Sequence, residues 1–524
     1  MIFRGPHPDV SAPNKNVAEF VLGDISAHKN KIAIIQSETK RKISFQELSE
    51  SINQLAAGLQ KNGFKKGDVL AIYSPNLPEY VVVFLAVLKL GGICTTVNPL
   101  YTAQELAKQL SDANAKIIVT VSAFLDKAKT ATQTHAVQEI IVIDSETEYR
   151  NLKGLMQANH ELSEPSISPK EDLCALPYSS GTTGLPKGVM LTHHNLIMNM
   201  RQIEGMTSHN AISEKDTVLG VLPFFHIYGM VVIMLYTLYR RGTIVCMSRF
   251  DMEGFLDAIQ THKVTKAPIV PPIVLGLAKH PAVEQFDLSS LELILSGAAP
   301  LGEGVAIEAA NRVGCNIAQG YGMTEASPVT HLLPIDSDPN KIGSIGVPIP
   351  NTEVMIVDPE TEQPLKTNQN GEIWIRGPQI MKGYLNRAEA TNESITQEGW
   401  YRTGDIGYVD EEGFFYAVDR IKELIKYKGM QVAPAELEAL LLTHASIADV
   451  AVIPVADEEA GELPKAVVVR KNELPVTSEE VMSFVADKVA PHKKIRLVEF
   501  VDKIPKSASG KILRRVLIQK EREK

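Results

Sequence analysis

Apolar runs alternate with amphipathic segments through the first third of the chain. Ser44 and Glu47 fit a helical capping box, and the apolar residues after them recur every three or four positions until Gly63. The same alternation continues along further predicted strands (69–73, 93–97 and 116–121) and helices (79–90 and from Thr102 onward). Strands that alternate with helices predict βαβ units, and therefore a parallel sheet covered by helices.

Beyond about residue 340 the pattern changes to short apolar strands separated by turns, which predicts an antiparallel β subdomain. Past Arg420 the chain returns to mixed helix and strand. The predicted segments are strands 353–358, 371–376 and 413–419, then helices 434–442 and 478–489 and strands 449–455 and 466–470. We therefore expect an α/β protein with a large N-terminal domain (1–420), which combines parallel sheets with the antiparallel subdomain, and a small α+β C-terminal domain (421–524).

The composition is that of an ordinary globular protein. The chain has 524 residues, more than one hydrophobic core usually organises, and it is 44% hydrophobic and 22% charged. A net charge of −9 gives no reason to expect nucleic acid or an anionic membrane surface as a partner. The four cysteines are far apart and lack metal-ligand spacing, so we expect free thiols in a reducing compartment.

Neither end of the chain resembles a secretory or peroxisomal signal, so a cytoplasmic protein is expected. Residues 218–239 lack Asp, Glu, Lys and Arg and are long enough to cross a bilayer. Pro223, His226, Thr237 and two glycines interrupt this stretch, so we expect no membrane span.

Residues 179–188 read Ser-Ser-Gly-Thr-Thr-Gly-Leu-Pro-Lys-Gly, between apolar segments that predict the two strands of a hairpin. Glycines permit close backbone approach, while hydroxyls, amides and Lys187 can surround phosphate oxygens. This is not a Walker loop, because that motif requires a hydroxyl after the lysine and this chain has Gly188. Taken alone, the loop fits a polyphosphate site of another class or an ordinary polar surface turn.

Six more motifs follow in order along the chain. They are Phe-His-Ile-Tyr (225–228), Ser-Gly-Ala-Ala-Pro (296–300), Gly-Tyr-Gly-Met-Thr-Glu (320–325), Tyr-Arg-Thr-Gly-Asp (401–405), Asp-Arg (419–420) with Gly-Met-Gln (429–431), and Pro-Lys-Ser-Ala-Ser-Gly-Lys (505–511). With the loop at 179–188, the series resembles the adenylate-forming superfamily of acyl-CoA synthetases, luciferases and adenylation domains over about residues 44–511. Residues 379–384 and 509–514 make the 4-coumarate CoA ligase-like acyl-CoA synthetases the most similar subgroup.

The resemblance implies an acid-thiol ligase that uses ATP, Mg²⁺ and CoA. A carboxylate attacks the α-phosphate of ATP to give acyl-AMP and pyrophosphate, and CoA then displaces AMP. Glu325 is assigned to the metal, Asp405 to the ribose hydroxyls and Tyr321 to the adenine face. The implied ATP- and AMP-binding residues are Ser179, Ser180, Gly181, Thr182, Thr183, Gly184, Lys187, Gly297, Ala298, Ala299, Gly320, Tyr321, Gly322, Thr324, Asp405 and Arg420.

By the same resemblance, the small domain turns between the two half-reactions about a hinge at Lys422. Lys511 contacts the reacting carboxylate and the α-phosphate during adenylation and then leaves with the domain. In the second orientation, Lys428 and Gly429 line the channel for CoA. The implied catalytic set is Lys511, His226, Lys426 and Gln431.

The acyl-binding residues that the resemblance implies are His226, Tyr228, Val231, Ala298 and Gly322. Plant coumarate ligases typically carry Asn where this chain has Val231, so a partner for a phenolic hydroxyl is missing there. An apolar pocket favours a cinnamate-like aromatic acid or a medium- to long-chain fatty acid.

Two other functions fit the same motifs. One is an acyl-AMP ligase that loads a carrier protein, which differs from a CoA ligase in the acceptor of the acyl group. The other is a non-catalytic sensor of acyl groups or nucleotides, against which the presence of Lys511 and Glu325 argues. We expect a carboxylic acid, ATP and CoA as partners, and a monomer or homodimer.

Overall fold

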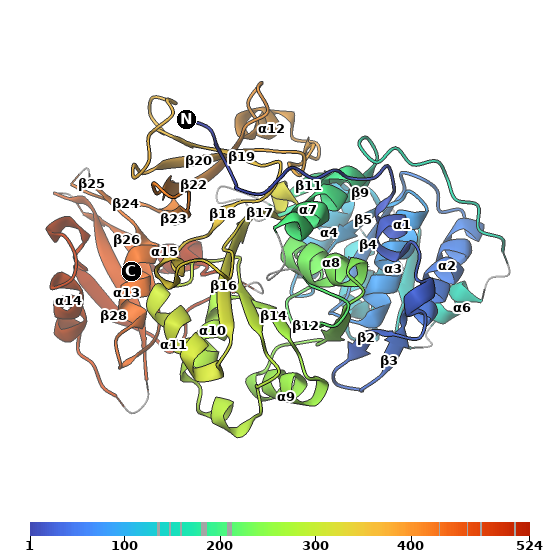
Figure 1. The fold of residues 1–524 in the computed structure, drawn as a ribbon, viewed down its shortest axis with the longest axis horizontal. Coiled ribbons are helices and arrows are strands. Elements are labelled where there is room, and N and C mark those ends of the chain that lie inside the picture. The colour runs from blue at the N-terminus through green and yellow to red at the C-terminus, as the bar shows by residue number, and fades with distance from the viewer. Residues whose placement is uncertain are drawn as a thin grey trace.

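The structure is a computed structural model that describes residues 1–133, 137–145, 148–157, 160–179, 186–206, 212–428, 430–457, 459–471, 474–507 and 510–524. Two large mixed sheets, an antiparallel sheet and a small C-terminal sheet make up the described fold. The small sheet lies at one end of the molecule, and the sheet built around the first helices lies at the other (Figure 1). The expected fold class, including a separate C-terminal domain, is confirmed, while its boundary at residue 420 stays a prediction.

The first large sheet has the order β10-β11-β9-β5-β4-β6-β7-β8, with β21 paired to β11. Its strands from β5 to β8 are parallel, and β10 and β11 form the predicted antiparallel hairpin. The strands are β4 (Val69–Tyr73), β5 (Ile93–Thr96), β6 (Ala115–Thr120), β7 (Glu139–Val142), β8 (Arg150–Asn151), β9 (Leu173–Ala175), β10 (Tyr178–Ser179), β11 (Lys187–Thr192) and β21 (Gly383–Tyr384).

Helices of the first half follow the predicted alternation. Ser44 and Glu47 form the predicted capping box of α2, in which Leu48, Ile52 and Leu55 are buried. Thr102 and Glu105 form another at the start of α4. The helices are α1 (Val17–Leu22), α2 (Phe45–Lys61), α3 (Pro78–Lys89), α4 (Ala103–Asp112), α5 (Leu125–Thr132), α6 (Leu152–Met156) and α7 (His193–Gly205).

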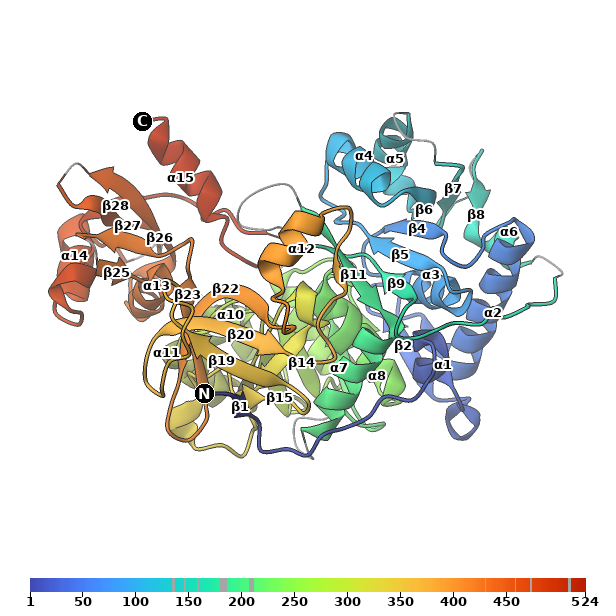
Figure 2. The same cartoon turned by 90° about the horizontal axis from the view of Figure 1, so that it is seen from above.

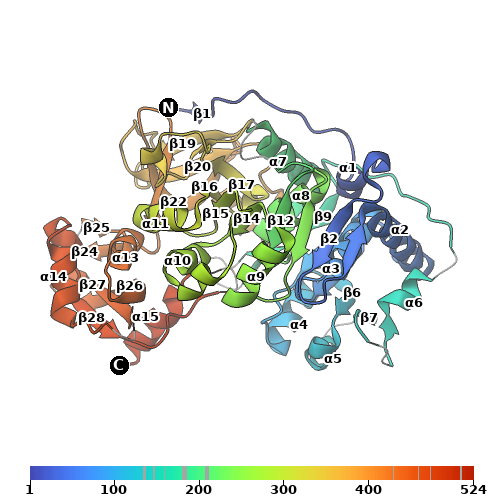
Figure 3. The same cartoon turned by 60° about the horizontal axis from the view of Figure 1, so that its bottom comes forward.

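The second large sheet lies between the first sheet and the C-terminal domain (Figure 3). Its order is β18-β17-β16-β15-β14-β12-β13-β2-β3, and the strands from β2 to β16 along this order are parallel. They are β2 (Ile32–Gln36), β3 (Lys42–Ser44), β12 (Thr217–Gly220), β13 (Thr243–Cys246), β14 (Lys266–Ile269), β15 (Leu293–Ser296), β16 (Asn316–Gly322), β17 (Val329–Leu332) and β18 (Val347–Pro348).

The apolar stretch 218–239 is divided among several elements of this region. It begins in β12 and continues into a π-helix (Tyr228–Leu235) whose residues are all buried. The following helices are α8 (Tyr236–Tyr239), α9 (Met252–His262), α10 (Pro271–Lys279) and α11 (Glu303–Val313). Among the described helices, none combines the length and the apolar character that crossing a membrane requires.

The antiparallel subdomain predicted after residue 340 is present and takes in the N-terminal strand. Its order is β1-β19-β20-β22-β23, which Figure 2 shows from above. The elements are β1 (Phe3–Arg4), β19 (Glu353–Val357), β20 (Gly371–Arg376), α12 (Ala388–Ser394), β22 (Tyr401–Val409) and β23 (Phe415–Arg420). Short 3₁₀ segments lie at Ser26–His28, Ser122–Phe124, Pro281–Gln285, Thr324–Ala326, Pro339–Lys341 and Pro491–Lys493.

The C-terminal domain has a hydrophobic core of its own, to which Ile425, Leu437, Val468 and Val481 belong. One continuous core, by contrast, joins the two large sheets. The C-terminal elements are β24 (Ile425–Tyr427), β25 (Met430–Val432), α13 (Pro434–Leu442), β26 (Ile447–Asp457), β27 (Gly461–Arg470), α14 (Ser478–Ala486), β28 (Leu497–Phe500) and α15 (Arg514–Arg522). The predicted helix 434–442 is found with the same bounds.

Candidate active site

The expected phosphate loop joins β10 to β11. Ser179 and Lys187 pair across this hairpin, directly on either side of the loop. The remaining expected phosphate contacts in it, Ser180, Gly181, Thr182, Thr183 and Gly184, lie outside the described residues. The structure therefore fixes where the loop starts and ends.

A buried carboxylate, Glu325, lies beside the start of this loop. Its Oε1 accepts hydrogen bonds from the hydroxyls of Ser179 and Tyr384, each at 2.9 Å. The Lys187 ammonium lies 4.7 Å from the centroid of the Tyr384 ring. Thr324, another expected phosphate contact, begins the same 3₁₀ turn as Glu325. Strand β21 thus adds Tyr384, which sequence reasoning did not assign to the site.

Glu325 is also the residue expected to hold Mg²⁺. Both of its hydrogen bonds end on Oε1, so Oε2 has no hydrogen-bond partner among the described residues. No three His, Cys, Asp or Glu side chains come together as a metal-binding group within that part of the chain. A single free carboxylate oxygen fits Mg²⁺, which proteins often hold through one carboxylate together with substrate phosphates.

The expected ribose-binding residue, Asp405, lies on β22 directly opposite Arg420 of β23. The Tyr321 hydroxyl donates to Asp405 Oδ2 at 2.6 Å, and Arg420 Nε lies 3.2 Å from Oδ1. Burial raises the pKa of Tyr321, and the Asp405 charge acts in the same direction, so the phenol keeps its proton. Each carboxylate oxygen has a second acceptor position, which leaves Asp405 able to bind two further hydroxyls.

Lys511 reaches this site from the C-terminal domain. Its backbone carbonyl accepts from Ser507 N at 2.8 Å, and Gly510 beside it has φ of +76° and lies against Val270 and Pro272 of the large domain. Burial lowers the pKa of Lys511, and the positive charge of Arg420 lowers it further. The same electrostatic neighbourhood contains Asp405 and Glu325, which oppose the shift. The charge of Lys511 in the C-terminal domain therefore interacts with those of Asp405 and Glu325 in the large domain.

His226 lies at the same junction. Loss of hydration lowers its pKa to about 3, with Lys511 as the second cause, so its ring is neutral at pH 7. The Tyr228 backbone N–H donates to His226 Nδ1 at 3.3 Å. A neutral imidazole that accepts at Nδ1 carries its proton on Nε2. His226 thus offers a hydrogen-bond donor without a positive charge.

Close contacts of the backbone explain why small residues occupy several positions that we expect to bind the acyl group and the nucleotide. A Cβ on Gly322 would lie 2.1 Å from the Pro328 carbonyl oxygen, and one on Gly297 would lie 3.1 Å from the Tyr228 ring. Gly320 is similarly close to Leu332. Ala298 has φ of +70°, while Ala299 beside it is half-buried. A Cβ on Gly297 would also lie 3.4 Å from the Gly320 carbonyl oxygen, so these two glycines form a close-packed backbone wall next to Tyr228.

A small apolar cavity of about 30 Å³ lies beyond this wall. Leu295 connects the two, because its carbonyl accepts a 2.8 Å hydrogen bond from the Tyr228 hydroxyl and its side chain lines the cavity. The lining residues are Ile203, Ile212, Val232, Tyr236, Lys266, Ala267, Pro268, Leu293, Leu295, Val329 and Leu332. Val231, which we expected in the acyl pocket, is fully buried in the π-helix but is not among these residues.

The other expected residues that the structure describes lie on the outer hairpin of the C-terminal domain, formed by β24 and β25, or just before it. Lys426 and Gln431 pair across β24 and β25. The Lys428 ammonium lies 2.7 Å from the Glu459 carboxylate and is exposed. Lys422, the expected hinge, is exposed in the turn that follows β23, and Gly429 lies outside the described residues. Within the described residues, no hydrogen bond or ion pair joins Lys426 or Gln431 to Asp405 or Glu325, and neither is among the groups that shift the pKa of Lys511.

Known proteins share this architecture over almost the whole chain. Residues 24–385 match the model of the AMP-binding enzyme family, and residues 436–511 match that of the AMP-binding enzyme C-terminal domain. A 4-coumarate-CoA ligase 2 from Nicotiana tabacum is 46% identical, over 99% of this chain and 96% of that ligase.

Solved structures agree with this match. The anthranilate CoA ligase AuaEII, in complex with anthranoyl-AMP, superposes with a TM-score of 0.90 at 26% identity, over 97% of this chain and 98% of that one. MatB from Rhodopseudomonas palustris superposes with a TM-score of 0.88 in its ATP-bound form and 0.78 in its apo form, at 29% identity over 97% of this chain and 99% of MatB. The chain belongs to the AMP-binding enzyme family.

Proposed function

We propose that this protein is an ATP-dependent acid:CoA ligase. A carboxylate attacks the α-phosphate of ATP, pyrophosphate leaves, and the CoA thiol then displaces AMP from the acyl-AMP. The observation that supports the proposal is that the charge of Lys511, in the C-terminal domain, interacts with those of Asp405 and Glu325 in the large domain. Burial of an ammonium beside Arg420 costs free energy, and an anionic ligand such as a phosphate would offset that cost.

In the first half-reaction two anions must meet, so charge neutralisation governs the rate. Lys511 donates to the acid carboxylate and to the α-phosphate as they approach. His226 contributes a neutral Nε2–H donor next to the same carboxylate, which its low pKa of about 3 supports. A neutral donor orients the acid without protonating it, so the carboxylate keeps its nucleophilic charge.

The nucleotide is held by the groups around Asp405. Its carboxylate accepts from the ribose hydroxyls, Arg420 fixes the carboxylate from the opposite strand, and Tyr321 presents its ring to adenine. Glu325 Oε2 is the free oxygen that would hold Mg²⁺, which when bound neutralises phosphate charge. We assign Ser179 and Lys187, which pair on either side of the phosphate loop, to the same phosphates.

The second half-reaction uses another face of the C-terminal domain. The domain turns about Lys422, withdraws Lys511 and brings the hairpin of Lys426 and Gln431 to the acyl-AMP, with Lys428 and Gly429 along the CoA channel. The closer superposition on ATP-bound MatB than on apo MatB supports an adenylation orientation in this structure.

The substrate class is an aromatic, cinnamate-like acid, with a medium- or long-chain fatty acid as the second candidate. The name of the Nicotiana tabacum relative, a 4-coumarate-CoA ligase, supports the aromatic acid. The mostly apolar side chains around the small cavity beyond Tyr228 are compatible with the apolar part of either class.

Acid-dependent pyrophosphate release across a panel of aromatic and fatty acids tests the proposal, with the acyl product identified by mass spectrometry. We expect release with cinnamate-like acids and an acyl-CoA product when CoA is present. Release without acyl-CoA, together with transfer to a phosphopantetheinyl carrier protein, would indicate the carrier-loading enzyme instead. Binding of nucleotide with no release for any acid would indicate a sensor and contradict the proposal.

A further inference from the structure

The segment that carries Lys511 closes on itself and leads directly into α15. Ser507 N donates to the Lys511 carbonyl at 2.8 Å, and Leu513 N donates to the Pro505 carbonyl at 2.9 Å. Arg514 is the first residue of α15, three positions after Lys511. A contact that fixes Arg514 therefore also restricts where Lys511 can lie.

The Arg514 guanidinium forms a ring of hydrogen bonds with two other elements of the C-terminal domain. Its Nη2 donates to Glu438 Oε2 at 2.6 Å, and its Nε donates to the Val452 carbonyl at 3.3 Å. The ring closes because the Val452 N–H donates to Glu438 Oε1 at 2.7 Å. The side chains of Arg514 and Glu438 are only 12% and 9% exposed. At this point α15, β26 and α13 are thus held together largely out of water.

Another nitrogen of Arg514 binds the residue that follows the expected hinge. Arg514 Nη1 donates to Glu423 Oε2, and Glu423 comes directly after Lys422. The Glu423 backbone N–H donates at 2.9 Å to the carbonyl of Arg420, the last residue of β23. The charge of Glu423 also interacts with that of Lys511. Arg514 therefore binds the expected hinge segment as well as α13.

The same network continues into the large domain through Asp419. Asp419 Oδ2 accepts from the Ala435 N–H at the start of α13 at 2.9 Å, and the charges of Asp419 and Arg514 interact. Arg514 carries one positive charge among three carboxylates, those of Asp419, Glu423 and Glu438. Rotation of the C-terminal domain would separate Asp419 from α13. The complete network therefore belongs to the orientation that buries Lys511.

We propose that Arg514 is a positioning residue for the adenylation half-reaction. It binds α13 and the segment after Lys422 at once, and thereby holds the start of α15, and with it Lys511, at the domain junction. A guanidinium suits this role because its planar fork binds two carboxylates in fixed directions, which an ammonium cannot do. The inference rests on the proposed ligase function and adds the residue that keeps Lys511 in place.

Arg514→Met tests the proposal through single-turnover rates of the two half-reactions. We expect adenylation to be roughly ten- to a hundredfold slower, because a displaced Lys511 no longer meets the reacting groups in the required geometry. Thioester formation from supplied acyl-AMP and CoA should keep its wild-type rate. Arg514→Lys keeps the charge but not the fork, so it should recover part of the lost adenylation rate.

A second variant removes only the contact with the segment after Lys422. Glu423→Gln leaves the ring of Arg514, Val452 and Glu438 intact, so no buried carboxylate loses its partner. We expect adenylation to be slowed about three- to tenfold relative to thioester formation, because one charge-assisted hydrogen bond is weakened.

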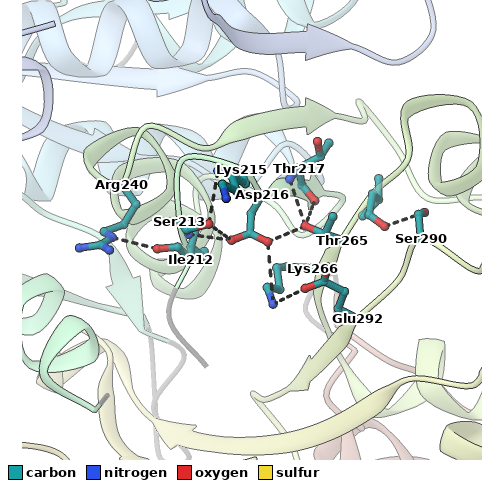
Figure 4. A network of polar contacts seen from close by, with 11 residues as sticks. Ile212, Ser213, Lys215, Asp216, Thr217, Arg240, Thr265, Lys266, Ser290 and Glu292 are labelled. Atoms are coloured by element: carbon teal, nitrogen blue, oxygen red, sulfur yellow. Dashed lines mark hydrogen bonds and ion pairs between the residues drawn. The ribbon is translucent and has the colours of Figure 1, made fainter. Parts of the chain in front are cut away.

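Two control variants separate positioning from a general loss of stability. Arg515→Met removes the next arginine, which is exposed, and should change neither half-reaction. Asp216→Asn disturbs a polar network within the large domain, in which Asp216 accepts hydrogen bonds from Ser213 and Thr265 (Figure 4). This variant should lower the thermal stability and leave the ratio of the two half-reactions unchanged. An unchanged ratio in Arg514→Met or, where that variant does not fold, in Glu423→Gln would overturn the proposal.

Chemical labelling of lysines with acetic anhydride, quantified by mass spectrometry, tests the placement of Lys511 without any activity. Lys520, which is exposed on α15, provides the reference. We expect labelling of Lys511 relative to Lys520 to rise about threefold or more in Arg514→Met, because the segment opens more often, and to stay unchanged in Arg515→Met. Unchanged labelling in Arg514→Met would overturn the proposal. If the wild type forms no acyl-AMP with any acid, the ligase proposal fails, and the labelling ratio still decides whether Arg514 holds Lys511.

Discussion

Two lysines of the C-terminal domain occupy opposite environments. Lys511 lies at the junction with the large domain, where burial lowers its pKa. Lys428 lies on the outer hairpin, where its hydrogen bond to Glu459 raises its pKa. The same side chain in the same domain is thus made easier to deprotonate in one place and harder in the other. Domain orientation, and not residue type, decides which lysine is placed for chemistry.

Specific contacts hold the domain in the orientation that buries Lys511. The backbone N–H of Ala435 in α13 donates to Asp419 Oδ2 of the large domain at 2.9 Å. A Cβ on Gly302 would lie 3.2 Å from that of Ala439, which places the start of α11 against α13. Rotation of the C-terminal domain must break these contacts. They therefore shift the equilibrium between its two orientations toward the one that buries Lys511.

Lys511→Ala removes the lysine at the domain junction and should have the largest effect of the substitutions that test the difference between Lys511 and Lys428. We expect adenylation to fall by about two to three orders of magnitude, because a charged donor that acts in the transition state typically contributes roughly 2–4 kcal/mol. Conversion of supplied acyl-AMP and CoA to thioester should survive. The control is Lys506→Ala, whose ammonium pairs with Asp449 inside the C-terminal domain. Equal loss of both half-reactions in Lys511→Ala would contradict the assignment.

Lys422→Pro tests whether the C-terminal domain changes between its two orientations by rotation about this residue. Proline fixes φ, so the domain should stay in one orientation. We expect adenylation to persist while overall acyl-CoA formation falls by about tenfold or more. Lys422→Ala removes the same side chain without restricting φ and should retain turnover. Full turnover in the proline variant would show that the hinge lies elsewhere.

Asp419→Ala should have a smaller effect on the equilibrium between the two orientations of the C-terminal domain. Loss of one hydrogen bond to a carboxylate, about 1 kcal/mol or more, should slow adenylation roughly three- to tenfold relative to thioester formation. Asp251→Ala removes a helix cap within the large domain and serves as the control, because its bond to Gly254 N does not cross the junction. If the ratio of the two half-reactions changes equally in both variants, the contact does not select the orientation.

The pH dependence of the two half-reactions should differ as well. Lys511 must be protonated to act, and its pKa is lowered, so adenylation should decline with rising pH below the ordinary lysine value of about 10.4. Thioester formation from supplied acyl-AMP should lack this alkaline limb. The measurement is kcat/KM against pH for each half-reaction. His226, with a pKa of about 3, should add no limb near neutral pH.

Local sequence signals predicted most elements of the fold. The capping box at Ser44, the helix that starts after Thr102 and the helix at 434–442 are found as expected. These features depend on neighbouring residues, since a cap and a helical period act within one or two turns. Motif resemblance then selected Lys511 and Asp405, although neither position carries a local signal that distinguishes it from a solvated charge.

Packing between distant segments explains what the sequence did not reveal. Tyr384 joins Glu325 because β21 pairs with β11, some 190 residues earlier in the chain. Lys266 reaches the cavity because β14, β15 and the helix of Tyr236 converge there. A lone lysine within an apolar run has no periodicity or motif to mark it.

The sequence by itself determined the alternation of helices and strands, the family and the chemical groups of the reaction. Tertiary structure alone decided that the charge of Lys511, and not that of Lys428, interacts with Asp405, and that Lys266 and Tyr236 line the same cavity. The physical reason is that a side chain's charge state and hydrogen-bond capacity depend on what surrounds it in space. Those surroundings come from segments that lie far apart along the chain.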